Sequence, residues 1–231
     1  MIVAVLAQLT QAHSFYRDLK APSNCSISKP TQESYKKLKR LARYLVGCPR
    51  AISTFYKQGK EKYLVGWSDS DWAGCVETRK STSGGIIKLG SHVLKTWSST
   101  QDVIALSSGE AEYYALVKTG SQCLGMKAMM ADLGIVSKLK FKTDASAAKG
   151  ISMRKGLGKV RHIEVNQLWL QDKIHKGHIE LEKVDGKKNL ADALTKLVEG
   201  PDLTTHLLGS GLKFRMDRHE LAPEVAKWES V

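Results

Sequence analysis

The chain has 231 residues, 42% of them hydrophobic, which suits one ordinary domain with extensions or two small domains. Lys and Arg number 36 against 23 Asp and Glu, so the formal net charge is +13. This balance indicates a polyanionic partner, although a solvated basic surface with no specific partner remains an alternative. No run approaches the roughly 20 apolar residues of a membrane span, and the apolar start MIVAVLAQL lacks a basic n-region. We therefore expect an intracellular protein, cytoplasmic or nuclear, with no membrane partner.

The cysteines argue against zinc. Cys25, Cys48, Cys75 and Cys123 are widely spaced, no two have CxxC spacing, and none lies near a matching pair of histidines. We expect free thiols in a reducing compartment.

A basic helix is predicted near the start of the chain. Apolar residues in 32–46 recur at helical spacing, and Thr31 is placed to cap this segment. The polar face carries Lys36, Lys37, Lys39, Arg40 and Arg43. Either this face is simply solvated or it follows nucleic-acid phosphates, and the residues leave both interpretations open.

Four strands are expected next. The segments 51–57 and 63–69 flank Gln58-Gly59-Lys60, which predicts a hairpin. The segments 85–89 and 92–97 flank Gly90-Ser91, which predicts a second hairpin. A long helix over 108–133 follows, because Ser107 and Glu110 have capping-box spacing and Gly134 can end a helix.

The second half alternates helices and strands. We expect strands at 139–143 and 179–184, and helices at 145–153, 162–175 and, capped by Asn189, 189–197. The tail has little periodicity and is expected to be partly disordered. From residue 63 onward the order is then β-β-β-α-β-α-α-β-α, an α/β pattern.

Two aspartates follow strand-like runs. Asp69 ends the segment 63–69, and Asp144 follows the segment 139–143. If these strands are parallel neighbours, their carboxylates face each other and repel unless cations lie between them. Oxygen ligands favour Mg²⁺ or Mn²⁺ over Zn²⁺.

The long helix offers a third carboxylate. Glu110 is committed to the capping box, whereas Glu112 shares a helix face with Leu116 and Cys123, the face that a helix buries. Glu112 is therefore the better ligand candidate, with a salt bridge to a lysine as the alternative. Asp192 stands in the first turn of its predicted helix, where a negative charge is favourable in any case.

Six motifs in series carry a family resemblance. GWSDSDWAG, STSGG, ALSSGEAEYYAL, TDASAA, RHIE and LADALTK, from about residue 63 to 197, resemble the ribonuclease H region of copia-type LTR retrotransposon polyproteins. KPTQESYKKLKRLARYLVG resembles the stretch that joins reverse transcriptase to ribonuclease H. The resemblance implies a ribonuclease H-like fold, a five-stranded mixed sheet flanked by helices, over 51–198. Residues 1–50 would be a basic helical connection, and 199–231 a C-terminal tail.

The resemblance also implies a site and an activity. The family's D-E-D-D metal site falls on Asp69, Glu112, Asp144 and Asp192, which would hold two Mg²⁺ or Mn²⁺ ions. Asp71 then either supports the metal ligands without binding metal itself or belongs to the following loop. The implied activity is hydrolysis of the RNA strand of RNA–DNA hybrids during retrotransposon reverse transcription, with a reverse transcriptase domain of the same polyprotein as a possible partner.

Contacts to the hybrid are expected from basic and hydroxyl side chains. Besides the basic helix, Arg154 and Lys155 would contact phosphates, and Ser68, Ser70 and Ser146 stand near enough in sequence to contact 2′-hydroxyls. His162 is expected to be structural. The loop 185–188 lacks the histidine that assists product release in cellular ribonucleases H.

Two other functions compete. A catalytically silent nucleic-acid-binding remnant is favoured by the missing polymerase motif and disfavoured by the presence of all four carboxylates. DNA strand transfer by an integrase fits less well, because integrases use three acidic residues and the GWSD and LADALTK motifs do not match them.

Overall fold

The computed structural model describes residues 50–75, 78–158, 162–196, 198 and 200–217, and seven single positions between 32 and 46. Those seven positions are helical and exposed, in agreement with the helix predicted there. Of the basic residues expected on it, Lys36, Lys39 and Arg43 are among them, whereas Lys37 and Arg40 lie outside the described residues.

A mixed sheet of five strands, in the order β4-β3-β2-β5-β6, forms the centre of the fold. Strands β2 (Tyr63–Asp71), β3 (Thr82–Leu89) and β4 (His92–Thr100) form an antiparallel meander. Strands β5 (Lys138–Thr143) and β6 (Ile179–Lys183) continue the sheet parallel to β2. The predicted α/β class, with a five-stranded mixed sheet, is confirmed, and so is the β3–β4 hairpin.

The other predicted hairpin is wrong. Strand β1 (Arg50–Ser53) does not pair with β2 but forms a separate antiparallel pair with β7 (Leu212–Arg215). Thr54 extends this pairing, since its N–H donates to Gly211 O at 3.2 Å. The Gln58-Gly59-Lys60 turn signal was local, but strand pairing depends on which side chains can be buried together across the chain.

The tail also differs from expectation over residues 200–217. Helix α6 (Gly200–Gly209) packs Leu203 and Leu207 against Leu212 of β7, and this small cluster orders the segment. Lys88 of β3 donates to Gly209 O at the helix end, at 2.7 Å. Residues 218–231 lie outside the described residues.

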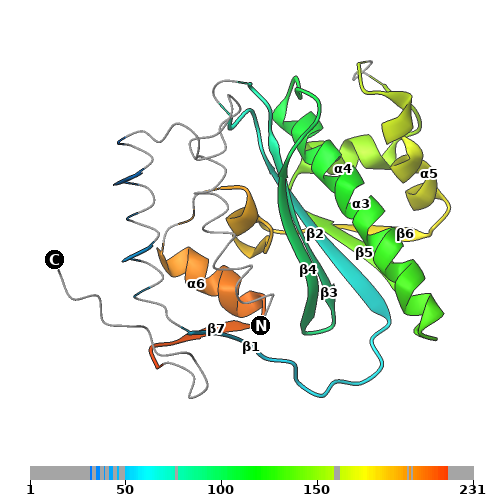
Figure 1. Ribbon diagram of the computed structural model, residues 1–231. Coiled ribbons are helices and arrows are strands. Elements are labelled where there is room, and N and C mark those ends of the chain that lie inside the picture. Colours follow the sequence, from blue (N-terminus) through cyan, green and yellow to red (C-terminus); the bar gives the residue numbers. More distant parts are fainter. Residues whose placement is uncertain are drawn as a thin grey trace.

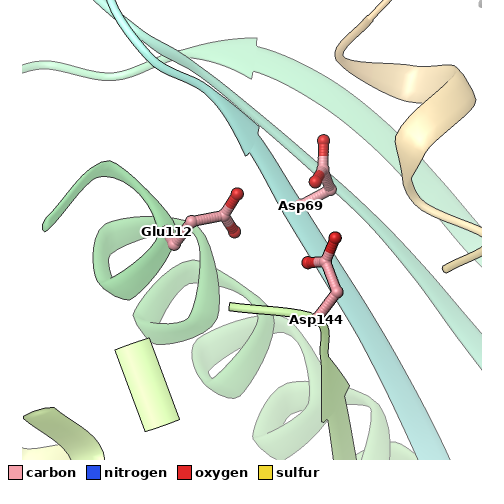
Figure 2. Close-up of side chains that lie close together, drawn as sticks. All are labelled: Asp69, Glu112 and Asp144. Carbon is pink, nitrogen blue, oxygen red and sulfur yellow. The ribbon is translucent and has the colours of Figure 1, made fainter. Parts of the chain in front are cut away.

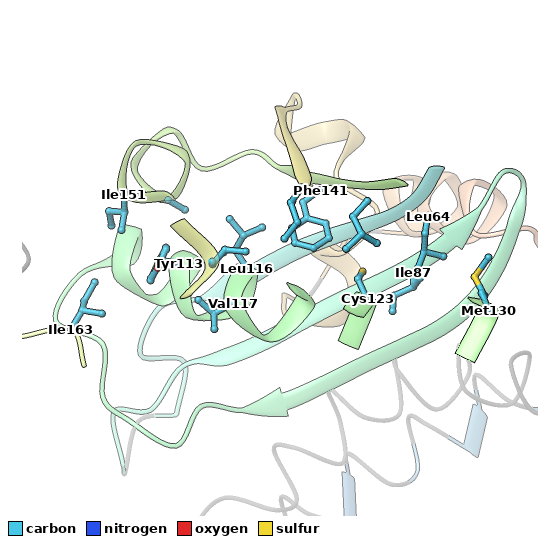
Figure 3. Packing of buried hydrophobic residues seen from close by; sticks show 14 residues of the cluster. Leu64, Ile87, Tyr113, Leu116, Val117, Cys123, Met130, Phe141, Ile151 and Ile163 are labelled. Atoms are coloured by element: carbon cyan, nitrogen blue, oxygen red, sulfur yellow. The ribbon is translucent and has the colours of Figure 1, made fainter. Parts of the chain in front are cut away.

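Helices α3 (Ser108–Asp132), α4 (Ser146–Met153) and α5 (Trp169–His175) lie on one side of the sheet, and α6 lies on the other (Figure 1). The main core forms between the sheet and α3, where Leu64 and Phe141 meet Leu116 and Cys123 (Figure 3). Helix α3 packs directly on β2 because Gly66 has no side chain: a Cβ there would lie 2.7 Å from Cys123 Sγ.

The predicted ends of α3 are confirmed. The N–H of Glu110 donates to Ser107 Oγ at 3.2 Å, which is the expected N-cap. Gly134 follows the helix with φ +76°, and the N–H of Ile135 donates to Met130 O at 2.8 Å. This left-handed glycine ends the helix by satisfying its last carbonyl groups.

Two predicted helices are shorter than expected. The segment 162–175 contains a 3₁₀ turn, η1 (Val165–Gln167), before α5. The segment 189–197 contains only η3 (Asp192–Leu194), after the similar turn η2 (Gly186–Lys188). None of the described helices is long and apolar enough to span a bilayer.

Candidate metal centre

Three carboxylates converge at one end of the sheet. Asp69 lies near the end of β2, Asp144 directly follows β5, and Glu112 lies in the second turn of α3. One ligand oxygen from each residue lies within 4.8 Å of the others, and Figure 2 shows the three side chains pointing toward a common space. The parallel pairing of β2 with β5 brings the two aspartates together, as the sequence predicted for neighbouring strands.

Glu112 is buried, and one of its carboxylate oxygens has no hydrogen-bond partner among the described residues. It is only 9% exposed, and the oxygen in question is Oε2. Burial, together with the nearby Asp69 and Asp144 carboxylates, raises the Glu112 pKa to about 9. An unpaired buried carboxylate oxygen beside other carboxylates is what a cation site requires.

Asp69 is fully buried, and both of its oxygens have partners. Thr195 Oγ1 donates to Oδ2, and Lys196 Nζ lies 2.8 Å from Oδ1. Burial and the Asp192 carboxylate raise the Asp69 pKa to about 7, against the lowering effect of Lys196.

Asp192 stands apart from the other three carboxylates. It is not a member of the cluster of mutually close oxygens; instead its Oδ1 lies 3.2 Å from Lys196 Nζ, which also binds Asp69. Three of the four residues expected to hold metal therefore form one close cluster. The fourth, Asp192, is linked to this cluster through Lys196.

The lysine was not singled out from the sequence. The signal for it was the i, i+4 spacing of Asp192 and Lys196 within LADALTK, although such spacing is common on surfaces and on its own indicates little.

The Asn189 side chain forms hydrogen bonds beside the carboxylate cluster. Its Nδ2 donates to Ser68 O at 2.9 Å and to Asp144 Oδ1 at 3.3 Å, while its Oδ1 accepts from the N–H of Ala191. The predicted capping role is partly right, because the side chain does accept from the following turn. Its amide group, however, also ties the end of β2 to Asp144, and the chain after it forms η3 instead of a full helix.

Glu110 and His162 form a separate structural group. Glu110 is 1% exposed and accepts from Leu106 N at 2.9 Å, from Tyr114 Oη at 2.8 Å and from His162 Nε2 at 2.6 Å. The glutamate is thus fully engaged at the start of α3, and His162 anchors that start to the segment before η1.

Asp71 closes the turn that follows β2. Its side chain accepts from the N–H of Thr82 on the paired strand β3. A Cβ at Gly74 would lie 2.0 Å from Asp71 Oδ2, so the loop folds tightly over this carboxylate. Asp71 is not part of the close carboxylate cluster.

The carboxylates fit a hard divalent cation. All donors in the cluster are carboxylate oxygens, the ligands preferred by Mg²⁺ and Mn²⁺, and Glu112 Oε2 lacks any other partner among the described residues. The described cysteines, Cys75 and Cys123, are not members of this cluster, and Cys25 and Cys48 lie outside the described residues.

Comparison with known proteins finds retrotransposon Pol polyproteins among the relatives of the chain. The chain is 28% identical over 175 residues to the retrovirus-related Pol polyprotein of tobacco transposon TNT 1-94, and 31% identical over 170 residues to that of Arabidopsis transposon RE1. These matches cover 74% and 72% of the chain. The chain is a homologue of retrotransposon Pol polyproteins. It spans only 13% and 12% of the lengths of these two relatives, and no protein-family model matches it.

Solved structures similar to this Pol homologue include a ribonuclease H1 isolated from compost, crystallised with an RNA/DNA hybrid. That match covers 57% of the chain and 93% of the enzyme, at 15% identity and a TM-score of 0.38. The architecture that the resemblance implied, a five-stranded mixed sheet flanked by helices, is present in the chain.

The residues expected to contact nucleic acid are placed very differently. Ser68 and Ser70 are buried, so neither can reach a 2′-hydroxyl, and that expectation is wrong for both. Ser146 is exposed at the start of α4 and accepts from Lys183 Nζ at 2.6 Å. Lys155 is exposed, whereas Arg154 is half-buried with Nε and Nη2 unpaired among the described residues.

Proposed function

We propose that the chain hydrolyses the RNA strand of RNA–DNA hybrids with the help of Mg²⁺ or Mn²⁺, during retrotransposon reverse transcription. One observation carries the proposal: Asp69, Glu112 and Asp144, from three different elements, bring their oxygens within 4.8 Å of one another. Holding three carboxylates so close without a cation is costly. Homology to Pol polyproteins supports the biological setting.

Each carboxylate has a distinct place. Asp69, fixed in the central strand, faces both Glu112 and the Asp192 side of the site and can serve ions at either position. Glu112 contributes an oxygen with no competing hydrogen bond, and Asp144 is oriented by Asn189. Divalent ions held there would activate a water molecule and stabilise the leaving 3′ oxygen.

The proposed substrate is a hybrid duplex, which the ribonuclease H1 neighbour binds in its crystal. Ser146, two residues after Asp144, is exposed and can donate or accept at a 2′-hydroxyl in the minor groove. Lys36, Lys39, Arg43 and Lys155 are exposed and can contact phosphates. A reverse transcriptase domain of the same polyprotein is the proposed neighbour.

A binding-only remnant is the second candidate. It is favoured by Lys196, whose ammonium group compensates Asp69 and Asp192 without any metal. Such a protein would bind a hybrid through its basic surface and leave it intact.

A cleavage assay separates the two. The chain is incubated with a hybrid labelled on each strand, in Mg²⁺, Mn²⁺ or EDTA, and compared with Asp69→Asn. We expect metal-dependent cutting of the RNA strand, reduced at least about 100-fold in Asp69→Asn, because that residue serves every proposed ion position. Asp102→Asn, an exposed carboxylate in the loop before α3, is the matched control and should cut normally. Tight, salt-sensitive binding without cutting by the native chain would favour the remnant.

A further inference from the structure

Lys196 joins two of the four acidic residues. Its Nζ lies 2.8 Å from Asp69 Oδ1 and 3.2 Å from Asp192 Oδ1, so one ammonium group bridges both carboxylates. The Asp69 side chain is fully buried, whereas the lysine side chain is 43% exposed. Among the described residues, Lys196 is the cation that forms an ion pair with Asp69.

Local structure places this lysine. The N–H of Lys196 donates to Asp192 O at 2.9 Å, and the N–H of Thr195 donates to the same oxygen at 3.1 Å. The turn after η3 therefore sets the lysine next to Asp192. Thr195 Oγ1 donates to the other Asp69 oxygen, so the same turn supplies partners for both.

The bridge is more than a surface ion pair. Isolated exposed pairs contribute little, but here one partner is a buried carboxylate that also faces Glu112 and Asp144. Removing the cation from such a group leaves an uncompensated buried charge. A lysine side chain ordinarily carries its positive charge at neutral pH.

We propose that Lys196 is an internal counter-ion that occupies the Asp69–Asp192 position in the metal-free protein and competes with a second divalent cation for it. This inference rests on the proposed function, because it requires a first cation at the Asp69–Glu112–Asp144 cluster. The first cation would bind the three clustered carboxylates without displacing a positively charged side chain. The second must displace the ammonium group, which can swing into solvent because its side chain is partly exposed.

Divalent-ion binding in the absence of nucleic acid tests this. Mn²⁺ binding is followed by electron paramagnetic resonance and calorimetry in the native chain and in Lys196→Gln. We expect the native chain to bind one Mn²⁺ tightly and a second more weakly. In Lys196→Gln the second affinity should tighten about tenfold or more, because a positive charge in contact with both ligands is gone. Asp192→Asn should abolish the second site and spare the first.

Two further variants are matched controls. Lys187→Gln removes one positive charge from an exposed side chain in η2, near the site, and should change the second affinity less than about threefold. Lys196→Arg keeps the charge and should bind Mn²⁺ as the native chain does.

Melting temperature gives an independent readout. Metal-free Lys196→Gln should melt below the native chain, because Asp69 loses its counter-ion. Saturating Mn²⁺ should close the difference, since the metal then supplies the positive charge.

The possible failures are distinguishable. Unchanged or weaker second-ion binding in Lys196→Gln, with the first site intact, would overturn the role of Lys196 alone. No Mn²⁺ binding by the native chain, or binding that survives Asp69→Asn unaltered, would overturn the metal centre of the proposed function as well.

Discussion

At the residue scale, Glu112 and Asp69 make the site unstable when no cation is present. Both carboxyl groups are buried beside other carboxylates, and both pKa values are raised, to about 9 and about 7. An ordinary unfolded carboxyl group has a pKa near 4. The folded metal-free protein therefore holds protons at neutral pH that the unfolded chain releases.

Stability of the metal-free protein should consequently fall as pH rises. Between about pH 4 and pH 9 the native state binds more protons than the unfolded state, and the free energy of unfolding then decreases with pH. Urea denaturation in EDTA at pH 5, 7 and 9 measures this. In Glu112→Gln the decrease in the free energy of unfolding between pH 5 and pH 9 should be smaller by about 2 kcal/mol or more, because the amide does not titrate. A variant as pH-dependent as the native chain would contradict the assignment.

Glu110 shows why the second glutamate of this helix is different. It is even more deeply buried than Glu112, yet three donors satisfy its carboxylate. Burial alone does not distinguish a cation ligand from a structural carboxylate; the partners of the oxygens do.

At the scale of elements, helix α6 holds the β1–β7 pair through a small apolar cluster. Leu207 is 9% exposed and packs in this cluster, whereas Leu208, next to it, is 54% exposed. The two leucines therefore form a matched pair for testing whether the cluster orders this part of the chain.

Leu207→Ala should lower the free energy of unfolding by about 2 kcal/mol, through lost burial and the cavity left behind. Leu208→Ala should change it by less than about 0.5 kcal/mol. Hydrogen exchange should quicken in β1 and β7 of Leu207→Ala before it does in β2 and β5. Within the described part of the chain, β1 and β7 form a two-stranded sheet of their own, whereas β2 and β5 belong to the five-stranded sheet. Equal effects of the two variants would exclude the cluster as the cause.

Element prediction worked where periodicity is local and strong. The 25-residue helix α3, its caps and its buried face follow from residue spacing, and the same spacing places Glu112 on the inner face. The helix predicted over 189–197 is only the short turn η3. The Asn189 side chain makes long-range contacts to Ser68 and Asp144, which no local sequence pattern contains.

At the scale of the whole molecule, the net charge of +13 predicts binding that weakens with salt. The exposed Lys36, Lys39 and Arg43 should supply part of it. Changing all three to Gln should reduce the slope of log K against log salt by about 2 to 3 for an uncut hybrid, since each phosphate contact contributes about 0.9.

The control for this prediction changes Lys57, Lys60 and Lys62 to Gln. These exposed lysines lie before β2, at the opposite end of that strand from Asp69. The slope should then fall by no more than about 1. Equal slopes for the two triple variants would mean that the basic helix makes no particular phosphate contacts. Fluorescence anisotropy over a salt series, in EDTA, measures both.

The sequence by itself determined the α/β class, the long helix with its caps, the β3–β4 hairpin and the carboxylates at the ends of β2 and β5, because these features depend on spacing within short segments. Only the tertiary structure decided that β1 pairs with β7, that Ser68 and Ser70 are buried, and that Lys196 bridges Asp69 and Asp192. Asp69 and Lys196 stand 127 positions apart. Contacts at such separations depend on how the packed layers meet, and a charge becomes costly or useful only once that packing removes water from around it.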